Sequence, residues 1–117
     1  MDARDNVVVN KSVAFALAII DFSEELERNK KFVIARQLLK SGTSIGANIH
    51  EAQNAESKAD FIHKMKIAAK ELEETKYWLQ LCKMAASYPF DINLEKDISE
   101  LGLILYKILG TSIRNKR

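Results

Sequence analysis

Residues that interrupt helices are scarce in this chain, which has one proline, Pro89, and four glycines among its 117 residues. An all-β fold needs a turn about every 8 to 12 residues, and such turns rely on glycine and proline. The shortage therefore excludes a many-stranded fold and favours long helices. A chain of this length supports one continuous core, so we predict a single domain over residues 1–117.

Cysteine and long apolar runs are also scarce. The one cysteine, Cys82, has no partner for an internal disulfide and no zinc-ligand spacing, so we interpret it as a small core residue. No stretch reaches the roughly 18 consecutive apolar residues of a membrane-spanning helix. The N-terminal residues, with Asp2 and Asp5, lack the apolar segment of a signal peptide. We therefore expect a cytoplasmic protein without membrane contact.

Charge of one sign prevails only locally. The net charge of +2 is too small to indicate a nucleic-acid partner by itself. Residues 21–27 carry four acids and no base, whereas residues 28–50 carry five bases and no acid. The five bases are Arg28, Lys30, Lys31, Arg36 and Lys40.

Apolar or small residues recur at alternating spacings of three and four in four stretches, which is typical of helices packed in a bundle. We predict helices over about residues 7–28, 31–54, 58–87 and 93–113. Their short connections favour an all-α, up-down-up-down antiparallel four-helix bundle. The predicted core seams are Val8, Ser12, Phe15, Ile19, Phe22 and Leu26; Ala35, Leu38, Gly42, Ile45, Ile49 and Ala52; Phe61, Met65, Ala68, Leu72, Thr75, Leu79 and Cys82; and Leu94, Ile98, Leu101, Leu105 and Ile108.

Several residues predict where these helices begin and end. Asn29 can adopt the left-handed conformation that ends a helix. Ser57, with an acid three residues later, resembles a capping box. We expect Pro89 to end the third helix, and Asp91 or Asn93 to cap the fourth.

Residues 41–48 read Ser-Gly-Thr-Ser-Ile-Gly-Ala-Asn, a composition that suggests a phosphate-binding turn. The seam nevertheless continues through them from Leu38 to Ile49, so we predict a helix. Gly42 and Gly46 would then share a face and allow a neighbouring helix to approach closely. Each glycine costs the helix about 1 kcal/mol relative to alanine, which the closer packing would offset.

A row of polar side chains runs beside the second seam, and carboxylates flank the third. This pattern fits either a polar binding site between the two helices or a hydrogen-bonded network that fixes their register. We favour a structural network, formed by Ser44, Asn48, Glu51, Glu71 and Glu74.

Catalytic and metal-binding motifs are missing. A di-iron bundle needs Glu-x-x-His on two helices, and only Asp60-x-x-His63 resembles it. The chain has no Walker loop and no Ser/His/Asp grouping, and His50-Glu51 lacks the second histidine of a zinc protease. We therefore expect no catalytic residue, no metal, no cofactor and no enzymatic activity.

Apolar residues also occur away from the seams. A helix that is apolar on two sides is either buried or in contact with another chain. A small bundle cannot bury every such face, so we predict self-association rather than scattered surface residues. The predicted interface comprises Leu103, Tyr106, Gly110, Tyr77 and Trp78.

Several motifs together resemble the bacterial four-helix bundle proteins, also called 23S rRNA intervening-sequence proteins, over about residues 7–110. The motifs are Lys11-Ser12, Phe15-Ala16, Gln37-Leu38, Ser41 to Ile49, Glu51-Ala52, Asp60 to Ile62, Ala68 to Glu71, Glu74 and Tyr77 to Leu79. The resemblance implies an up-down bundle that assembles as a cyclic homopentamer. A related branch is the accessory variability determinant of diversity-generating retroelements, which binds nucleic acid and a reverse transcriptase.

The resemblance favours a homo-oligomer that binds RNA or DNA, with a reverse transcriptase or a ribonucleoprotein component as a further partner. The alternative is a protein–protein adaptor whose charges only keep it soluble. In an up-down bundle, Arg28, Lys30, Lys31 and Arg36 would gather at one pole, with Lys40 following. We expect backbone- or shape-driven binding there, because the chain has no aromatic-rich strand on which bases could stack.

Overall fold

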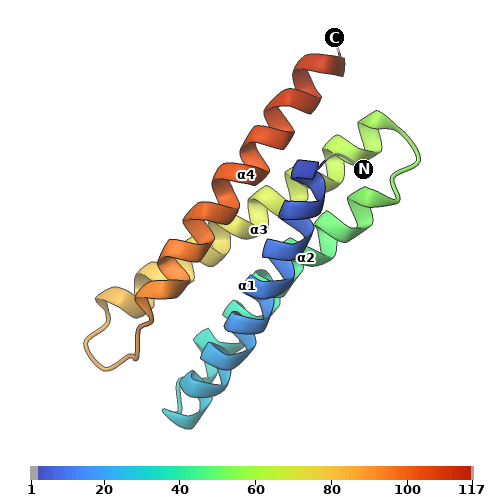
Figure 1. The fold of residues 1–117 in the computed structure, drawn as a ribbon. Coiled ribbons are helices and arrows are strands. Elements are labelled where there is room, and N and C mark those ends of the chain that lie inside the picture. Colours follow the sequence, from blue (N-terminus) through green and yellow to red (C-terminus); the bar gives the residue numbers. More distant parts are fainter. Residues whose placement is uncertain (1–2, 117) are drawn as a thin grey trace.

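The computed structural model describes residues 3–116, which fold into four α-helices (Figure 1). The helices are α1 (Ala3–Arg28), α2 (Phe32–Gln53), α3 (Lys58–Met84) and α4 (Ile92–Lys116). The described residues contain no strand, which confirms the all-α prediction. None of their helices is long and apolar enough to cross a membrane.

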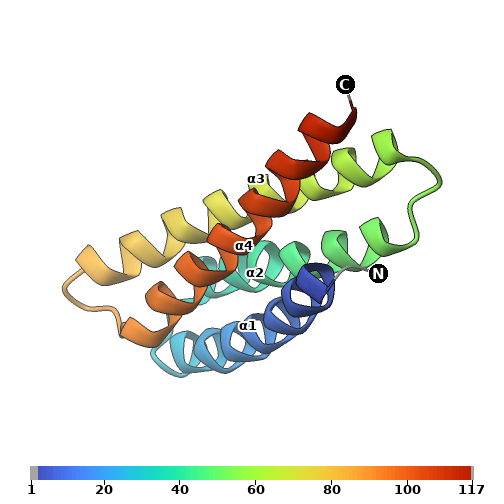
Figure 2. The ribbon, with the colours of Figure 1, turned by 45° about the horizontal axis from the view of Figure 1, so that its top comes forward.

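The four helices form one elongated bundle of 48 × 20 × 20 Å. Each helix packs against the next in the chain, and α1 also packs against α4. The α1–α2 turn and the α3–α4 loop lie toward one end of the bundle (Figures 1 and 2). The α2–α3 turn, the start of α1 and the end of α4 lie toward the other.

Burial of one stripe on each helix builds the core. Every predicted seam residue of α1, α2 and α4 is buried. On α3, the seam begins at Ile62 instead of Phe61, which is only partly buried. Phe61 lies four residues before the buried Met65 and Ile62 lies three before it, so helical spacing admits either residue and only the structure distinguishes them.

Close contact between α1 and α2 explains two glycines. Gly42 and Gly46 are buried within α2, which confirms the predicted helix over residues 41–48. A Cβ on Gly42 would lie 2.9 Å from both Cγ atoms of Ile19, and one on Gly46 would lie 3.2 Å from Ser12 Oγ. The two helices therefore approach more closely than larger side chains would permit.

The turn after α1 corrects one prediction. Lys30, not Asn29, adopts the left-handed conformation, with a φ of 63°. Lys30 N donates to Glu27 O at 2.9 Å, and Lys31 N donates to Leu26 O at 2.8 Å. These are the two bonds of a Schellman motif, which places the positive φ one residue beyond the cap. Asn29 is therefore the cap itself.

The end of α3 corrects another prediction. The helix ends at Met84 rather than near residue 87, because Ala85 is extended, with φ −78° and ψ 119°. Pro89 thus lies within the following loop and does not end the helix. The side chains of Tyr88 and Phe90 pack against the core and anchor this loop.

The remaining helix ends largely follow the sequence. Ser57 Oγ accepts a hydrogen bond from Asp60 N at 3.0 Å, which confirms the predicted cap of α3. At the start of α4, Asp91 Oδ1 accepts from Asn93 N at 2.9 Å, so Asp91 is the capping side chain. The first helix begins earlier than predicted, at Ala3, and the last ends later, at Lys116.

Candidate nucleic-acid interface

The α1–α2 turn and the α3–α4 loop meet through Lys31. Its Nζ donates to Ser87 Oγ at 3.2 Å and lies 4.9 Å from the centroid of the Tyr88 ring. The two connections therefore form one surface at this end of the bundle. We call its cations, Arg28, Lys30, Lys31 and Arg36, the basic pole.

Among the side chains that the structure describes, no carboxylate forms an ion pair with a cation of the basic pole. Arg28, Lys30 and Arg36 are exposed, and Lys31 is half-buried. Among the side chains described, residues 7–115, the ion pairs within 4.0 Å use other cations. They are Lys11–Glu100, Lys64–Glu51, Lys76–Glu73 and Lys83–Glu95. The four pole cations thus remain available for phosphate oxygens.

Acids lie mainly on the α1 side of the pole. Glu24 and Glu27 are exposed in the last turns of α1, whereas α2 has no acid before Glu51. The positive charge therefore follows the start of α2 rather than surrounding the whole end of the bundle. Such a one-sided distribution gives an anionic partner a preferred direction of approach.

Lys40 lies one helical turn beyond Arg36 and faces a different environment from the pole. Burial of the Glu71 carboxyl and the neighbouring Glu74 raise the pKa of Glu71, and Lys40 opposes this rise. Lys40 is thus close enough to Glu71 for their charges to interact. The structure separates it electrostatically from the other four predicted cations.

Lys83 comes near the pole but does not add to its free charge. Its Nζ donates to both carboxylate oxygens of Glu95 at 3.0 Å, and it lies 5.7 Å from the centroid of the Phe90 ring. The ion pair offsets its charge within the bundle.

Most residues of the predicted polar network form their hydrogen bonds within their own helix, and one of them pairs across to the neighbouring helix. Ser44 Oγ donates to Lys40 O at 2.6 Å and Asn48 Nδ2 donates to Ser44 O at 2.8 Å, so both bond within α2. Glu51 pairs with Lys64 on α3 at 3.9 Å. Glu74 accepts a long hydrogen bond of 3.4 Å from the Trp78 indole.

A buried contact between α2 and α3 comes from two neighbours of that row. The hydroxyls of Ser41 and Thr75 lie 2.9 Å apart, and both residues are buried. Thr75 Oγ1 also donates to Glu71 O at 2.7 Å. This pair satisfies two buried hydroxyls and links the registers of the two helices.

The outer face of α4 presents Leu103, Tyr106 and Gly110. Leu103 is 72% exposed. The Tyr106 hydroxyl donates to Glu73 Oε2 at 2.7 Å, and its burial together with this carboxylate raises the pKa of Tyr106 to about 12. A Cβ on Gly110 would contact only the Arg114 side chain, at 3.6 Å, so no described neighbour requires a glycine there. This face surrounds a surface hollow of about 600 Å³.

The two predicted aromatic residues of α3 lie on different sides of that helix. Tyr77 is exposed and follows Glu73, the partner of Tyr106, by one helical turn. Trp78 is partly buried and donates to Glu74. Their rings touch edge to face, with centroids 5.2 Å apart. Tyr77 can therefore extend the α4 face, whereas Trp78 points toward the Glu74 side.

Other exposed apolar residues were missed by the sequence reasoning. Val13 and Leu17 lie on the outside of α1, and Phe32 and Val33 begin α2. Val13 and Leu17 are four residues apart and off the seam, the same signal that identified the α4 face. Phe32 has no periodic signal, because it opens the helix, and only the structure reveals its exposure.

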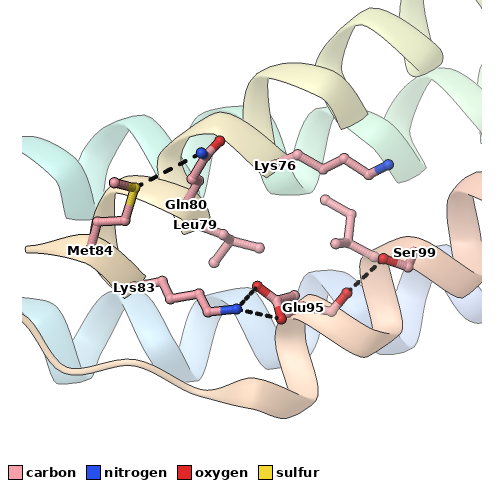
Figure 3. Close-up of a pocket in the computed structure, with 8 residues that line it drawn as sticks. Lys76, Leu79, Gln80, Lys83, Met84, Glu95 and Ser99 are labelled. Atoms are coloured by element: carbon pink, nitrogen blue, oxygen red, sulfur yellow. Dashed lines mark hydrogen bonds and ion pairs between the residues drawn. The ribbon is translucent and has the colours of Figure 1, made fainter.

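A further hollow of about 480 Å³ lies between α3 and α4 (Figure 3). Lys83 and Glu95 pair across it near the loop, Leu79 lies between the two helices, and Lys76 stands farther along α3. Among the described residues, no three His, Cys, Asp or Glu side chains are grouped to hold a metal. Cys82 is buried, and this burial raises the pKa of its thiol to about 11.

These features define the chain as an all-α helical-bundle protein with a cationic end and exposed apolar outer faces. It belongs to the 23S rRNA-intervening sequence protein family, whose family model matches residues 4–107. A crystal structure of a protein of unknown function from the S23 ribosomal protein family of Bacteroides thetaiotaomicron is 43% identical, with a TM-score of 0.86. The match covers 92% of this chain and 98% of that one. No curated protein matches the chain.

Proposed function

We propose that this protein is a cytoplasmic, non-enzymatic homo-oligomer that binds nucleic acid, most directly RNA, through the basic pole. The observation that carries the proposal is a set of four cations at one end of the bundle, none of which forms an ion pair with a carboxylate among the described side chains. Membership in a family named for 23S rRNA intervening sequences favours RNA over other polyanions. A reverse transcriptase or another ribonucleoprotein component is the further partner we propose.

The proposed subunit is an up-down-up-down antiparallel bundle. The contacts between α1 and α2 support this topology, because residue numbers rise along one helix as they fall along the other. Ser12 and Ile19 of α1 lie against Gly46 and Gly42 of α2, respectively. An antiparallel arrangement puts the α1–α2 turn and the α3–α4 loop at the same end, where Lys31 connects them.

We propose a ring, with five subunits as the expected number, because two separate apolar faces are exposed. One is the α4 face around Leu103, and the other is the α1 face around Leu17. Lys11 pairs with Glu100 at 3.7 Å and so faces α4, whereas Leu17, six residues later, is rotated about 120° away from it. Two different faces suit head-to-tail contacts, which give a ring when the rotation from one subunit to the next closes. A ring would repeat the basic pole around its axis and multiply weak phosphate contacts.

Titration with a structured RNA and a duplex DNA tests nucleic-acid binding. The test variant combines Lys30→Glu, Lys31→Glu and Arg36→Glu. The control combines Lys58→Glu, Lys66→Glu and Lys70→Glu on exposed positions of α3, and changes the net charge equally. We expect the pole variant to lose affinity and the control to retain most of it. An equal loss of affinity in both variants would show that only net charge matters, and would contradict a binding site at the pole.

Light scattering coupled to gel filtration tests assembly. We expect about five times the subunit mass of 13.3 kDa. Leu103→Glu should reduce this mass, whereas Val33→Glu, at a residue 69% exposed on another helix, should not. A monomeric wild-type protein at micromolar concentration would contradict the proposed interface.

The second candidate is a protein–protein adaptor without nucleic-acid binding. The exposed apolar faces of α1 and α4 favour it, because they suit a protein partner as well as a second copy. Retention of the oligomer with no measurable RNA or DNA binding would select this alternative.

A further inference from the structure

The basic pole combines its charges with an exposed aromatic ring. Phe32, the first residue of α2, is 48% exposed and directly follows Lys31. Arg36 lies one turn later on the same helix face, because residues four apart in a helix are neighbours. The ring thus lies between cations on both sides along the chain.

Phe32 differs from the other aromatic side chains of this end. Tyr88 lies beneath Lys31 and Phe90 beneath Lys83, and both rings pack partly against the core. Among the residues that the structure describes, no cation covers Phe32 in the same way. Its face is therefore open to a partner.

Resting on the nucleic-acid binding proposed above, we propose that the pole selects unpaired nucleotides, with Phe32 stacking against a base while the surrounding cations contact its phosphates. An exposed aromatic ring with cations next to it along the chain matches the two chemistries that single strands expose together, flat bases and a charged backbone. The bases of a duplex are already stacked on one another, so a duplex would engage the cations but not the ring. This departs from the backbone- or shape-driven binding expected from the sequence, which assigned no aromatic residue a stacking role.

Single-residue changes at Phe32 separate stacking from general hydrophobicity. Phe32→Leu keeps an apolar side chain but removes the aromatic face, whereas Phe32→Tyr keeps that face. Because the residue is half-exposed, we expect all three variants, including Phe32→Ala, to retain helicity and oligomeric mass. The probes are a fluorescent single-stranded RNA of about 10 nucleotides, within the usual range of site sizes, and a duplex of the same length.

Stacking contributes about 1–3 kcal/mol per base, which corresponds to a change in affinity of about 5- to 140-fold. We expect Phe32→Ala and Phe32→Leu to weaken single-strand binding by this factor, and Phe32→Tyr to leave it near the wild-type value. Duplex binding should not change. Wild-type affinity of Phe32→Leu for the single strand would overturn the inference.

The failure of this inference differs from failure of the proposed function. One outcome would support the cationic site but contradict stacking. In it, the wild type binds both probes, the pole charge variant binds neither, and the Phe32 variants bind as tightly as the wild type. If the wild type binds neither probe, both proposals fall. Binding of wild type and Phe32→Leu to anionic phospholipid vesicles, without RNA binding, would assign the pole to a membrane surface and also overturn the inference.

Discussion

Replacement of Gly42 by alanine tests the close packing of α1 on α2. The added Cβ would lie 2.9 Å from Cγ1 and Cγ2 of Ile19, whereas carbon atoms pack best at about 3.5–4.0 Å. Ile19 is fully buried, and its branched side chain has one strongly preferred rotamer in a helix, so it cannot turn aside. The helices must therefore move apart.

The expected net effect is a loss of stability. Overpacking of this kind lowers the free energy of unfolding by about 1–3 kcal/mol, and the higher helix propensity of alanine raises it by about 1 kcal/mol. With a rigid neighbour we expect the upper part of the range, a net loss of about 2 kcal/mol. Gly102→Ala is the matched control, because its Cβ would meet Leu72 at an ordinary 3.5 Å. The Gly102→Ala variant should be more stable than the wild type by about 0.5–1 kcal/mol, because alanine favours the helix over glycine.

Denaturant unfolding at one fixed protein concentration provides the comparison, since assembly shifts apparent stability with concentration. A double variant identifies the cause. Ile19→Ala removes both contacted Cγ atoms and leaves only the Cβ, at 3.3 Å, so in that background Gly42→Ala should destabilise the fold much less. Stabilisation by Gly42→Ala alone, or an unchanged cost in the Ile19→Ala background, would refute the proposed contact.

Three further predictions concern side chains within the fold. Ser23→Ala should leave stability unchanged or raise it by up to about 1 kcal/mol, because Ser23 Oγ is buried without a hydrogen-bond partner among the described residues. Thr75→Val, by contrast, should lower stability by about 1–2 kcal/mol, because it removes the hydrogen bond to Ser41. The midpoints of denaturant unfolding give both values. Lys30→Gly should stabilise the fold by about 1 kcal/mol in the same measurement, because glycine adopts a positive φ without strain, and Lys31→Gly, at an ordinary φ of −94°, should not. Cys82, with its pKa raised to about 11, should react with a thiol reagent at pH 8 only as fast as the protein unfolds, and rapid labelling of the folded protein would contradict its burial.

The sequence predicted most of the core because each helix buries one stripe with helical spacing. Gly42 and Gly46 also followed from that spacing, since a continuous seam placed them on a face toward another helix. The exchange of Phe61 for Ile62 arose in the first turn of α3, where two adjacent apolar residues leave the register open.

Features that depend on backbone geometry or on tertiary contacts were harder to predict from the sequence. A lysine at positive φ has no signature in composition, so Asn29 was predicted in place of Lys30. The exposure of the Phe32 ring and the pairing of Lys83 on α3 with Glu95 on α4 are properties of the packed helices, which spacing within one helix does not give. Sequence spacing identified the pole cations as a group, whereas only the structure shows that nearby Lys83 pairs with Glu95.

The salt dependence of RNA binding tests the proposed role of the basic pole most directly. For single-stranded RNA, the slope of log affinity against log salt concentration should be about −0.7 for each phosphate contacted. The Lys30→Glu, Lys31→Glu, Arg36→Glu variant should lose three such contacts per engaged subunit, which makes the slope shallower by about 2. A wild-type slope near zero, or the same slope in both proteins, would contradict phosphate binding by the pole.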